Sequence, residues 1–176
     1  MKKRLTTLAS IAALAAIFAL APAPLPAQIL EAELTVKGLA CPFCAYGLER
    51  KLKKLPAAAS VAITFKQNLA RVHFDGRESP DIGDFFRLVH DAGFKLEELR
   101  LLVRGRRAEA GGEPCLELPD GKMLPFTSDG VGAALAREVP VGTLVEARAG
   151  ARAAEEDAGR SRSYILSIES YQVIPR

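Results

Sequence analysis

Apolar residues recur at two spacings along the first half of the chain, every second residue in some segments and at helical spacing in others. Residues 29–37 alternate between apolar side chains on one side and charged or hydroxyl side chains on the other, which predicts a half-buried strand. Residues 61–65 and 70–74 alternate in the same way, and the short Gln67-Asn68 connection between them predicts a β-hairpin. A further strand is predicted to begin near Lys95.

Two amphipathic helices are predicted between these strands. In the first, apolar residues recur at helical spacing, at Cys44, Leu48, Leu52 and Leu55. We expect Pro56 to end this helix. In the second, we expect Ser79 as the N-cap, Pro80 as the first helical residue and Gly93 at the end. The order strand, helix, strand, strand, helix, strand predicts a ferredoxin-like βαββαβ domain over residues 28–98, with both helices on one face of an antiparallel sheet.

Residues 99–176 carry shorter patterns that predict a second domain. Strands are predicted at 99–107, 115–118, 122–126, 143–149 and 164–174. A short helix is predicted over 128–138, and three strands, a helix and two strands is the order of a small OB-like β-barrel. The predicted fold class is therefore α+β, with one long bent strand shared by both domains. Residues 151–163, rich in Ala, Glu, Arg and Gly, are predicted to form a mobile loop.

The first 27 residues have the composition of a cleavable signal peptide. Basic residues at Lys2, Lys3 and Arg4 precede an apolar run over 8–20, and a Pro- and Ala-rich segment follows it up to Ala27. The apolar run is shorter than the roughly 20 residues that a bilayer-spanning helix needs. We therefore expect the export machinery to deliver the chain to the periplasm, with a retained N-terminal anchor as the alternative.

The charge of the chain after this leader gives no argument for nucleic acid as a partner. The sequence has 24 Lys and Arg and 21 Asp and Glu, and three of the basic residues but none of the acidic ones lie in residues 1–27. The remainder is near neutral, without the basic excess typical of nucleic-acid binding. The second half has only three aromatic residues, Phe126, Tyr164 and Tyr171, short of a platform for stacking bases.

The segment from Gly38 to Cys44 places two cysteines between a predicted strand and the start of a helix. A helix N-terminus carries partial positive charge and free N–H groups, which favour the thiolate form that binds metal. Two thiolates suit a soft ion that accepts low coordination, such as Cu(I) or Hg(II), whereas structural Zn(II) requires four ligands. Cys41 and Cys44 are therefore the predicted metal ligands.

This loop and its surroundings resemble the heavy-metal-associated (HMA) domain family of copper chaperones, copper-pumping ATPase modules and periplasmic mercury-binding proteins. The resemblance covers about residues 30–104 and rests on Gly-x-x-Cys-x-x-Cys, on the leucine spacing after Cys44, and on Asp91-Ala92-Gly93-Phe94, which is similar to the family's packing beside the metal loop. It implies that Cys41 and Cys44 bind one soft ion, Cu(I) before Hg(II). It also implies transfer by thiolate exchange to a metal-transporting membrane protein or another metal carrier.

The chain departs from the family pattern at the loop itself. Leu39 stands where the family usually has Met, Ala40 where Thr, Ser or His is common, and Pro42-Phe43 where small residues are common. Cys-Pro-Phe-Cys is also typical of thiol-disulfide oxidoreductases, and paired cysteines in exported proteins are often structural disulfides. Both remain alternatives. The sequence has no Ser/His/Asp set or phosphate loop pattern, so we predict a binding protein and not an enzyme.

Four other features of the sequence are candidates for parts of the site. Cys115 is predicted to be a buried, inert thiol, with a third metal ligand across the domain interface as the alternative. His73 and His90 are predicted to be surface residues and not ligands. The basic residues of the first helix either steer an acidic partner to the loop or form a solvated face: Arg50, Lys51, Lys53 and Lys54.

Overall fold

The computed structural model describes residues 28–153 and 164–175, so the predicted signal peptide lies outside the described residues. The first half contains β1 (Gln28–Lys37), α2 (Pro42–Leu52), β2 (Ala58–Thr64), the 3₁₀ turn η1 (Phe65–Gln67), β3 (Leu69–Phe74), α3 (Ile82–Asp91) and β4 (Lys95–Ala110). The second half contains β5 (Glu113–Glu117), β6 (Met123–Pro125), α4 (Gly130–Glu138), β7 (Leu144–Ala153) and β8 (Tyr164–Val173).

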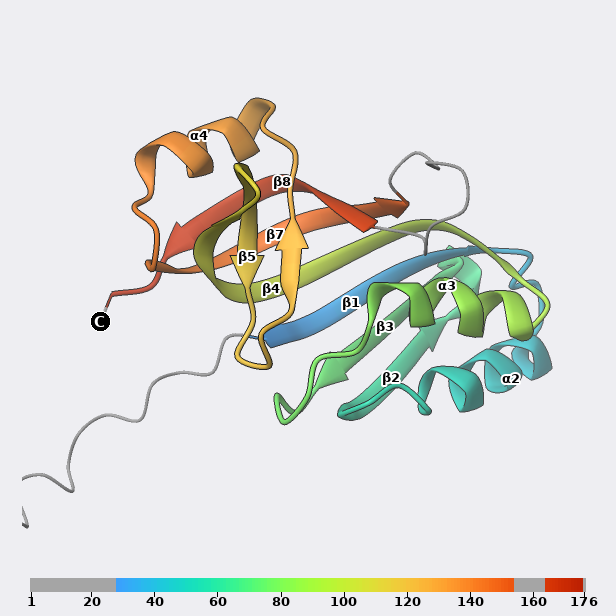
Figure 1. The fold of residues 1–176 in the computed structure, drawn as a ribbon. Helices are drawn as coiled ribbons and strands as arrows, with labels where there is room; N and C mark the ends of the chain where they lie inside the picture. The colour runs from blue at the N-terminus through green and yellow to red at the C-terminus, as the bar shows by residue number, and fades with distance from the viewer. Residues whose placement is uncertain (1–27, 154–163, 176) are drawn as a thin grey trace, which may run out of the picture.

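The first half has the predicted ferredoxin-like arrangement. Its strands lie in the order β2-β3-β1-β4, and every pair of neighbours is antiparallel. Helices α2 and α3 lie side by side against one face of this sheet (Figure 1). The hairpin predicted at Gln67-Asn68 is present, with Asn68 in the left-handed conformation at φ 54° that a tight turn requires.

The core of this half lies between the sheet and the two helices. Residues Ala32, Leu34 and Val36 of β1 are fully buried, as the alternation predicts, and meet Leu48 and Leu52 of α2 in one apolar cluster. Burying a leucine side chain contributes about 1.5–3 kcal/mol, so this stripe holds α2, and the loop before it, on the sheet. Phe85 of α3 is also fully buried and meets the ring of Phe74 edge-on, with centroids 6.1 Å apart.

Strand β4 belongs to both halves of the molecule. It is 16 residues long, and Figure 1 shows it as a curved strand running through the sheet. Residues 95–104 pair with β1, residues 100–106 pair with β7, and residues 106–110 pair with β5. The expected shared strand is therefore present, and the predicted domain boundary between residues 98 and 99 lies inside it, with no linker there.

The strands predicted for the second half are present to within a few residues, but the OB-like barrel is not confirmed. Strand β4 pairs with β5 and β7, β5 with β6, and β7 with β8. Strand β6 has only three residues, and the segment after it meets β8 through one isolated parallel bridge, Phe126 to Leu166. The sheet is not closed by a continuous ladder there. Helix α4 forms close to its predicted range.

Three predicted boundaries are wrong. Helix α2 ends at Leu52, before Pro56, because the chain leaves the helix through turns at Lys53 and Leu55. Helix α3 starts at Ile82, and its N-cap is Asp81 and not Ser79, because Asp81 is still extended at ψ 138°. Strand β7 continues to Ala153, into the segment predicted to be a mobile loop, and the rest of that segment, 154–163, lies outside the described residues.

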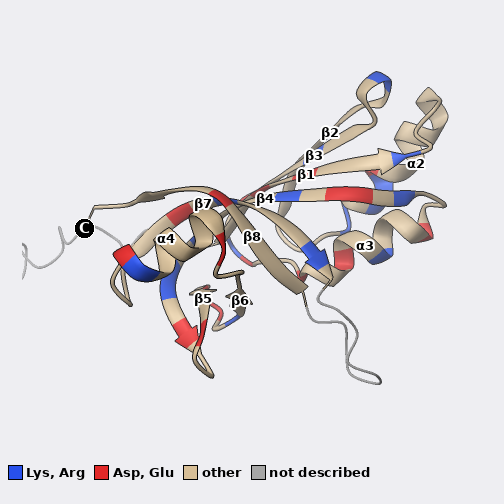
Figure 2. Ribbon diagram, turned by 90° about the horizontal axis from the view of Figure 1, so that it is seen from above, with Lys and Arg blue, Asp and Glu red and all other residues tan. Residues whose placement is uncertain are grey.

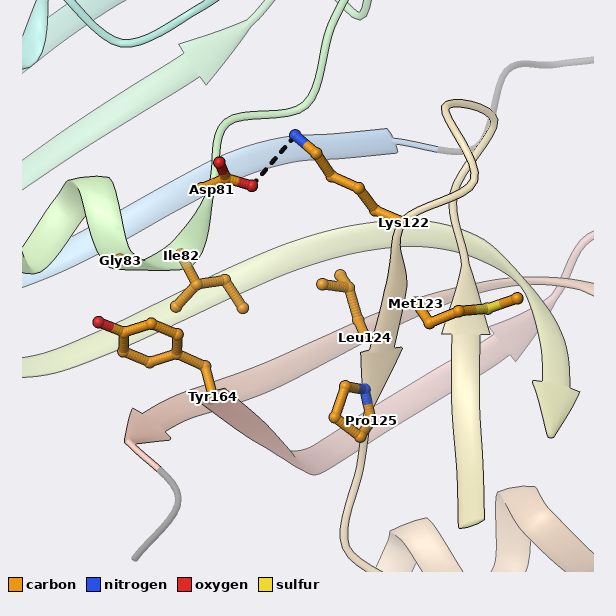
Figure 3. A pocket seen from close by; sticks show the side chains of 8 residues that line it. All are labelled: Asp81, Ile82, Gly83, Lys122, Met123, Leu124, Pro125 and Tyr164. Carbon is orange, nitrogen blue, oxygen red and sulfur yellow. Dashed lines mark ion pairs between the residues drawn. The ribbon is translucent and has the colours of Figure 1, made fainter. Parts of the chain in front are cut away.

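The two halves also meet through a lysine on the β5–β6 turn. The Lys122 Nζ donates to the backbone oxygen of Ser79 at 2.5 Å and lies 3.2 Å from the Asp81 carboxylate (Figure 3). This ion pair directs the Asp81 carboxylate to Lys122. The carboxylate makes no capping hydrogen bond to α3. Beside it lies an open cavity of about 450 Å³ between Ile82 of α3 and Tyr164 of β8.

Charged residues of both signs are interspersed along β4 and α3 (Figure 2). In residues 28–153 and 164–175, no helix combines the length and apolar character needed to cross a bilayer.

Candidate metal-binding loop

The loop between β1 and α2 is fixed to the body of the protein by two residues. Gly38 takes φ 94°, which favours glycine, and its carbonyl accepts a hydrogen bond from the Ala40 N–H at 2.9 Å. Leu39 is 1 % exposed and belongs to the core cluster. Leucine therefore anchors the loop where the HMA family usually has methionine.

Cys41 is the N-cap of α2, and its sulfur caps the helix directly. Its backbone is extended, Pro42 follows at the first helical position, and the Cys44 N–H donates to Cys41 Sγ at 3.1 Å. Proline is favoured at that position because its missing N–H would have no partner in the helix. The N-cap sulfur takes the place of the oxygen that usually accepts from the third helical N–H.

The structure brings the two predicted ligands together. Cys41 and Cys44 form a disulfide, with their Cα atoms 5.1 Å apart. Both side chains are half-buried, while Pro42 and Phe43 between them are exposed. In the reduced form, the same backbone would present two thiol groups to one ion at the solvent-facing end of α2.

The segment predicted to pack beside the loop does so. Gly93 takes φ 85°, and the Phe94 N–H donates to the Val89 carbonyl at 3.1 Å, which closes the end of α3. A Cβ atom built on Gly38 would lie 3.7 Å from Phe94 Cδ1. The Phe94 ring therefore lies against the backbone where the metal loop begins.

Two aromatic side chains next to the cysteines are exposed. Phe43 is 89 % exposed and Tyr46 is 61 % exposed, on the outer side of the first turns of α2. Phe43 enters the sequence predictions only as part of the redox-like motif, and Tyr46 is absent from them. Helical spacing could have predicted that both are exposed, because Phe43 and Tyr46 fall outside the stripe that Cys44 and Leu48 define on the helix.

The basic residues at the end of α2 and just after it are only partly free of neighbours. Lys53 forms an ion pair with Glu49 at 2.7 Å, and the Arg50 guanidinium lies 6.0 Å from the centroid of the Tyr46 ring. Arg50 and Lys54 are exposed, and Lys51 is half-buried. The basic face therefore begins two turns after Cys44, on the helix that carries it.

The other candidate residues do not join the loop. Cys115 is 1 % exposed on β5, where its Sγ lies 3.8 Å from Met123 Sδ, and burial raises the pKa of its thiol. The described part of the chain contains no group of three or more His, Cys, Asp or Glu side chains placed to hold a metal ion. His73 and His90 are exposed, as predicted, and His73 Nδ1 lies 3.1 Å from Glu31.

The sequence matches no protein-family model, and no curated protein sequence matches it. Similar solved structures include a copper-binding domain from HMA7, a P-type ATPase, with 26% identity, a TM-score of 0.36, and coverage of 39% of this chain and 92% of that domain. The CopZ metallochaperone is 18% identical, with a TM-score of 0.35 and coverage of 38% and 97%. The yeast copper transporter domain Ccc2a, solved in apo and Cu(I)-loaded states, is 24% identical, with a TM-score of 0.34 and coverage of 39% and 92%.

Each of these structures covers 38–39% of this chain, and the C-terminal half is not covered.

Proposed function

We propose that this chain is a soft-metal chaperone or scavenger that carries one Cu(I) ion between Cys41 and Cys44. The observation that carries the proposal is the placement of two cysteine sulfurs in one turn at the solvent-facing start of α2. Thiolate is a soft ligand, and Cu(I) is a soft ion that accepts few ligands. Hg(II) is the alternative cargo on the same chemistry.

Reduction must come before metal binding in this account. The Cys41–Cys44 disulfide accepts two electrons and two protons from a reductant, here a dithiol donor, and becomes two thiols. Binding of Cu(I) then releases the thiol protons to solvent, because the ligand form is the thiolate. The free N–H groups and the positive end of α2 stabilise the sulfur that carries negative charge.

Transfer requires that a partner's ligands reach the bound ion. Cys41 and Cys44 are only half-buried, and the Pro42-Phe43 segment that joins them is exposed, so an incoming thiolate can approach from the solvent side without unfolding the core. The buried Leu39 and the packed Phe94 hold the other side of the loop in place. Release then proceeds by exchange of one cysteine ligand at a time for a ligand of the partner.

We further propose that the protein works in the periplasm, delivering metal to a metal-transporting membrane protein or another metal carrier. Export is supported by the signal-peptide pattern of residues 1–27. The exposed Arg50 and Lys54 support steering toward an acidic partner surface, which would make the rate of transfer depend on salt. N-terminal sequencing of the protein from a periplasmic extract tests the location.

The metal proposal is tested by an anaerobic Cu(I) titration against a competing colorimetric chelator, with the chain fully reduced. We expect one tightly held ion at the loop, and we expect Cys41→Ser and Cys44→Ser each to abolish that binding. The disulfide form is the matched control and should leave the loop's equivalent of copper with the chelator. If the reduced chain also leaves the copper with the chelator, the cargo is not Cu(I), and the same titration with Hg(II) follows.

Thiol-disulfide exchange is the second candidate function, and the disulfide itself favours it. In that reaction a Cys41 thiolate would attack a substrate disulfide, and Cys44 would resolve the mixed disulfide, leaving the substrate with two thiols and this chain oxidised. The strand pairs around the loop are all antiparallel, which is not the thioredoxin-like sheet with a parallel pair. Insulin reduction at enzymic rates, lost in Cys41→Ser, would favour this function over metal carriage.

A further inference from the structure

Sulfur atoms outside the loop are rare in this chain, and two of them are in contact. Apart from Cys41, Cys44 and Met1, the sequence has only Cys115 and Met123. Their sulfurs are 3.8 Å apart in the second half of the molecule.

The β5–β6 hairpin explains this contact. Its register places Glu117 opposite Met123 and Cys115 opposite Pro125. Alternate residues of a strand face the same side, so Cys115, Glu117 and Met123 share one side of the hairpin. Met123 is also among the residues that line the open cavity beside Tyr164 (Figure 3).

We propose that Cys115 and Met123 form a second soft-metal site, which takes one Cu(I) ion. Thiolate and thioether sulfur are the ligands that select Cu(I) in proteins. With metal–sulfur bonds of about 2.3 Å, an ion touching both sulfurs at 3.8 Å would subtend an angle of about 111°. Both sulfurs therefore reach one ion without rearrangement of the hairpin, and the bent angle leaves room for a further ligand.

Access to this site depends on the methionine. Cys115 is 1 % exposed, whereas Met123 is 43 % exposed and lies over it. A methionine side chain is unbranched and flexible, so Met123 can move aside to admit an ion and then bind it. On binding, the Cys115 thiol releases its proton to solvent as the copper–thiolate bond forms, and neither sulfur changes oxidation state. Glu117, on the same side of the hairpin, adds a negative charge that attracts a cation, and the nearby Arg107 charge opposes it.

This site does not depend on the function proposed for the loop, and the two can be measured separately. In the double variant Cys41→Ser/Cys44→Ser, an anaerobic Cu(I) titration against a colorimetric chelator reports on the second site alone. We expect one ion per chain. Adding Cys115→Ser should abolish this binding, and adding Met123→Leu, which conserves side-chain volume, should weaken it by a factor on the order of 10–100.

Alkylation provides a readout that needs no variant at the site. In the same double variant, Cu(I) should protect Cys115 from iodoacetamide in partly denaturing conditions, as measured by mass spectrometry, and a copper chelator should remove the protection. The proposal is overturned if the double variant binds no copper, or if it binds copper equally well after Cys115→Ser. The single variant Cys115→Ser reports on the loop alone. If this variant binds no Cu(I), the proposed function of the loop is contradicted, and the second site still stands.

Discussion

The backbone N–H of Cys44 donates to the Sγ of Cys41 at 3.1 Å, so one sulfur of the pair caps the helix that carries the other. Cys41 therefore has a structural role in addition to its proposed role as a ligand. Serine keeps a side-chain acceptor at the N-cap position, whereas alanine does not. This difference separates the two roles of Cys41 by experiment.

Under reducing conditions, we expect Cys41→Ala to lower the free energy of unfolding by about 0.5–2 kcal/mol relative to Cys41→Ser, because only the serine can cap α2. Both variants should lose high-affinity Cu(I) binding at the loop, since each removes a sulfur. Urea unfolding with dithiothreitol present measures the first effect, and a chelator titration measures the second. Equal stability of the two variants would show that the capping bond contributes nothing.

The anchor residue of the loop gives a second prediction. Leu39 is 1 % exposed in the core, so Leu39→Ala should cost about 2–5 kcal/mol of stability. Because the same residue holds the loop against the sheet, the variant should also bind Cu(I) more weakly at temperatures where it remains folded. Leu39→Met is the matched control and should cost less than about 1.5 kcal/mol. A Leu39→Ala chain with unchanged copper affinity would show that loop anchoring does not matter for the site.

The contact between the two halves gives a third prediction. The Lys122 Nζ donates to the buried Ser79 carbonyl at 2.5 Å, and Lys122→Met leaves that carbonyl without this donor. We expect a loss of about 1–3 kcal/mol in thermal or urea unfolding. Asp81→Asn removes only a largely exposed ion pair and should cost less than about 1 kcal/mol, an effect that salt reduces. A Lys122→Met chain within a few tenths of a kcal/mol of the unmutated one would contradict the role of this bond.

The buried Cys115 thiol predicts that the stability of the folded chain depends on pH in the alkaline range. Burial raises the pKa of Cys115 above its ordinary 9.0, with the Arg107 charge acting in the opposite direction and Glu117 and Glu109 adding to the rise. The folded state thus holds this proton more tightly than the unfolded chain does. The resulting stability is fully present below about pH 9 and is lost as pH rises through the folded-state pKa.

We therefore expect the free energy of unfolding to fall less steeply with pH above about pH 9 in Cys115→Ala than in the unmutated chain. Urea unfolding of both chains at a series of pH values measures the difference in slope, in which the other titrating groups cancel. Parallel slopes would show that the thiol titrates alike in the folded and unfolded chains.

Local patterns predicted the ferredoxin-like half well, for physical reasons. The alternation in β1 reports burial directly, because one face of the sheet packs on the helices and the other meets solvent. The turn at Asn68 and the loop from Gly38 to Cys44 are short-range features that need no knowledge of distant contacts. The pairing of Cys41 with Cys44 follows from their spacing at one helix end.

Features set by contacts between distant segments could not be predicted in this way. The segment just before α3 contacts Lys122, about 40 residues away, through Ser79 and Asp81. Closure of the second half depends on how far β6 pairs with β8, and a three-residue strand carries too little pattern to decide that. The contact of Cys115 with Met123 requires the register of the β5–β6 hairpin, which the sequence pattern leaves open.

The central claim is that Cys41 and Cys44 together bind Cu(I), and copper K-edge X-ray absorption tests it most directly. The sample is the reduced Cys115→Ser chain loaded anaerobically with one equivalent of Cu(I), which removes the second proposed site. We predict a first shell of sulfur ligands at roughly 2.3 Å, close to other metal–thiolate distances, that disappears when Cys41→Ser and Cys44→Ser are added to this Cys115→Ser chain. A first shell of nitrogen or oxygen alone, or copper that desalting removes from the reduced chain, would contradict the claim.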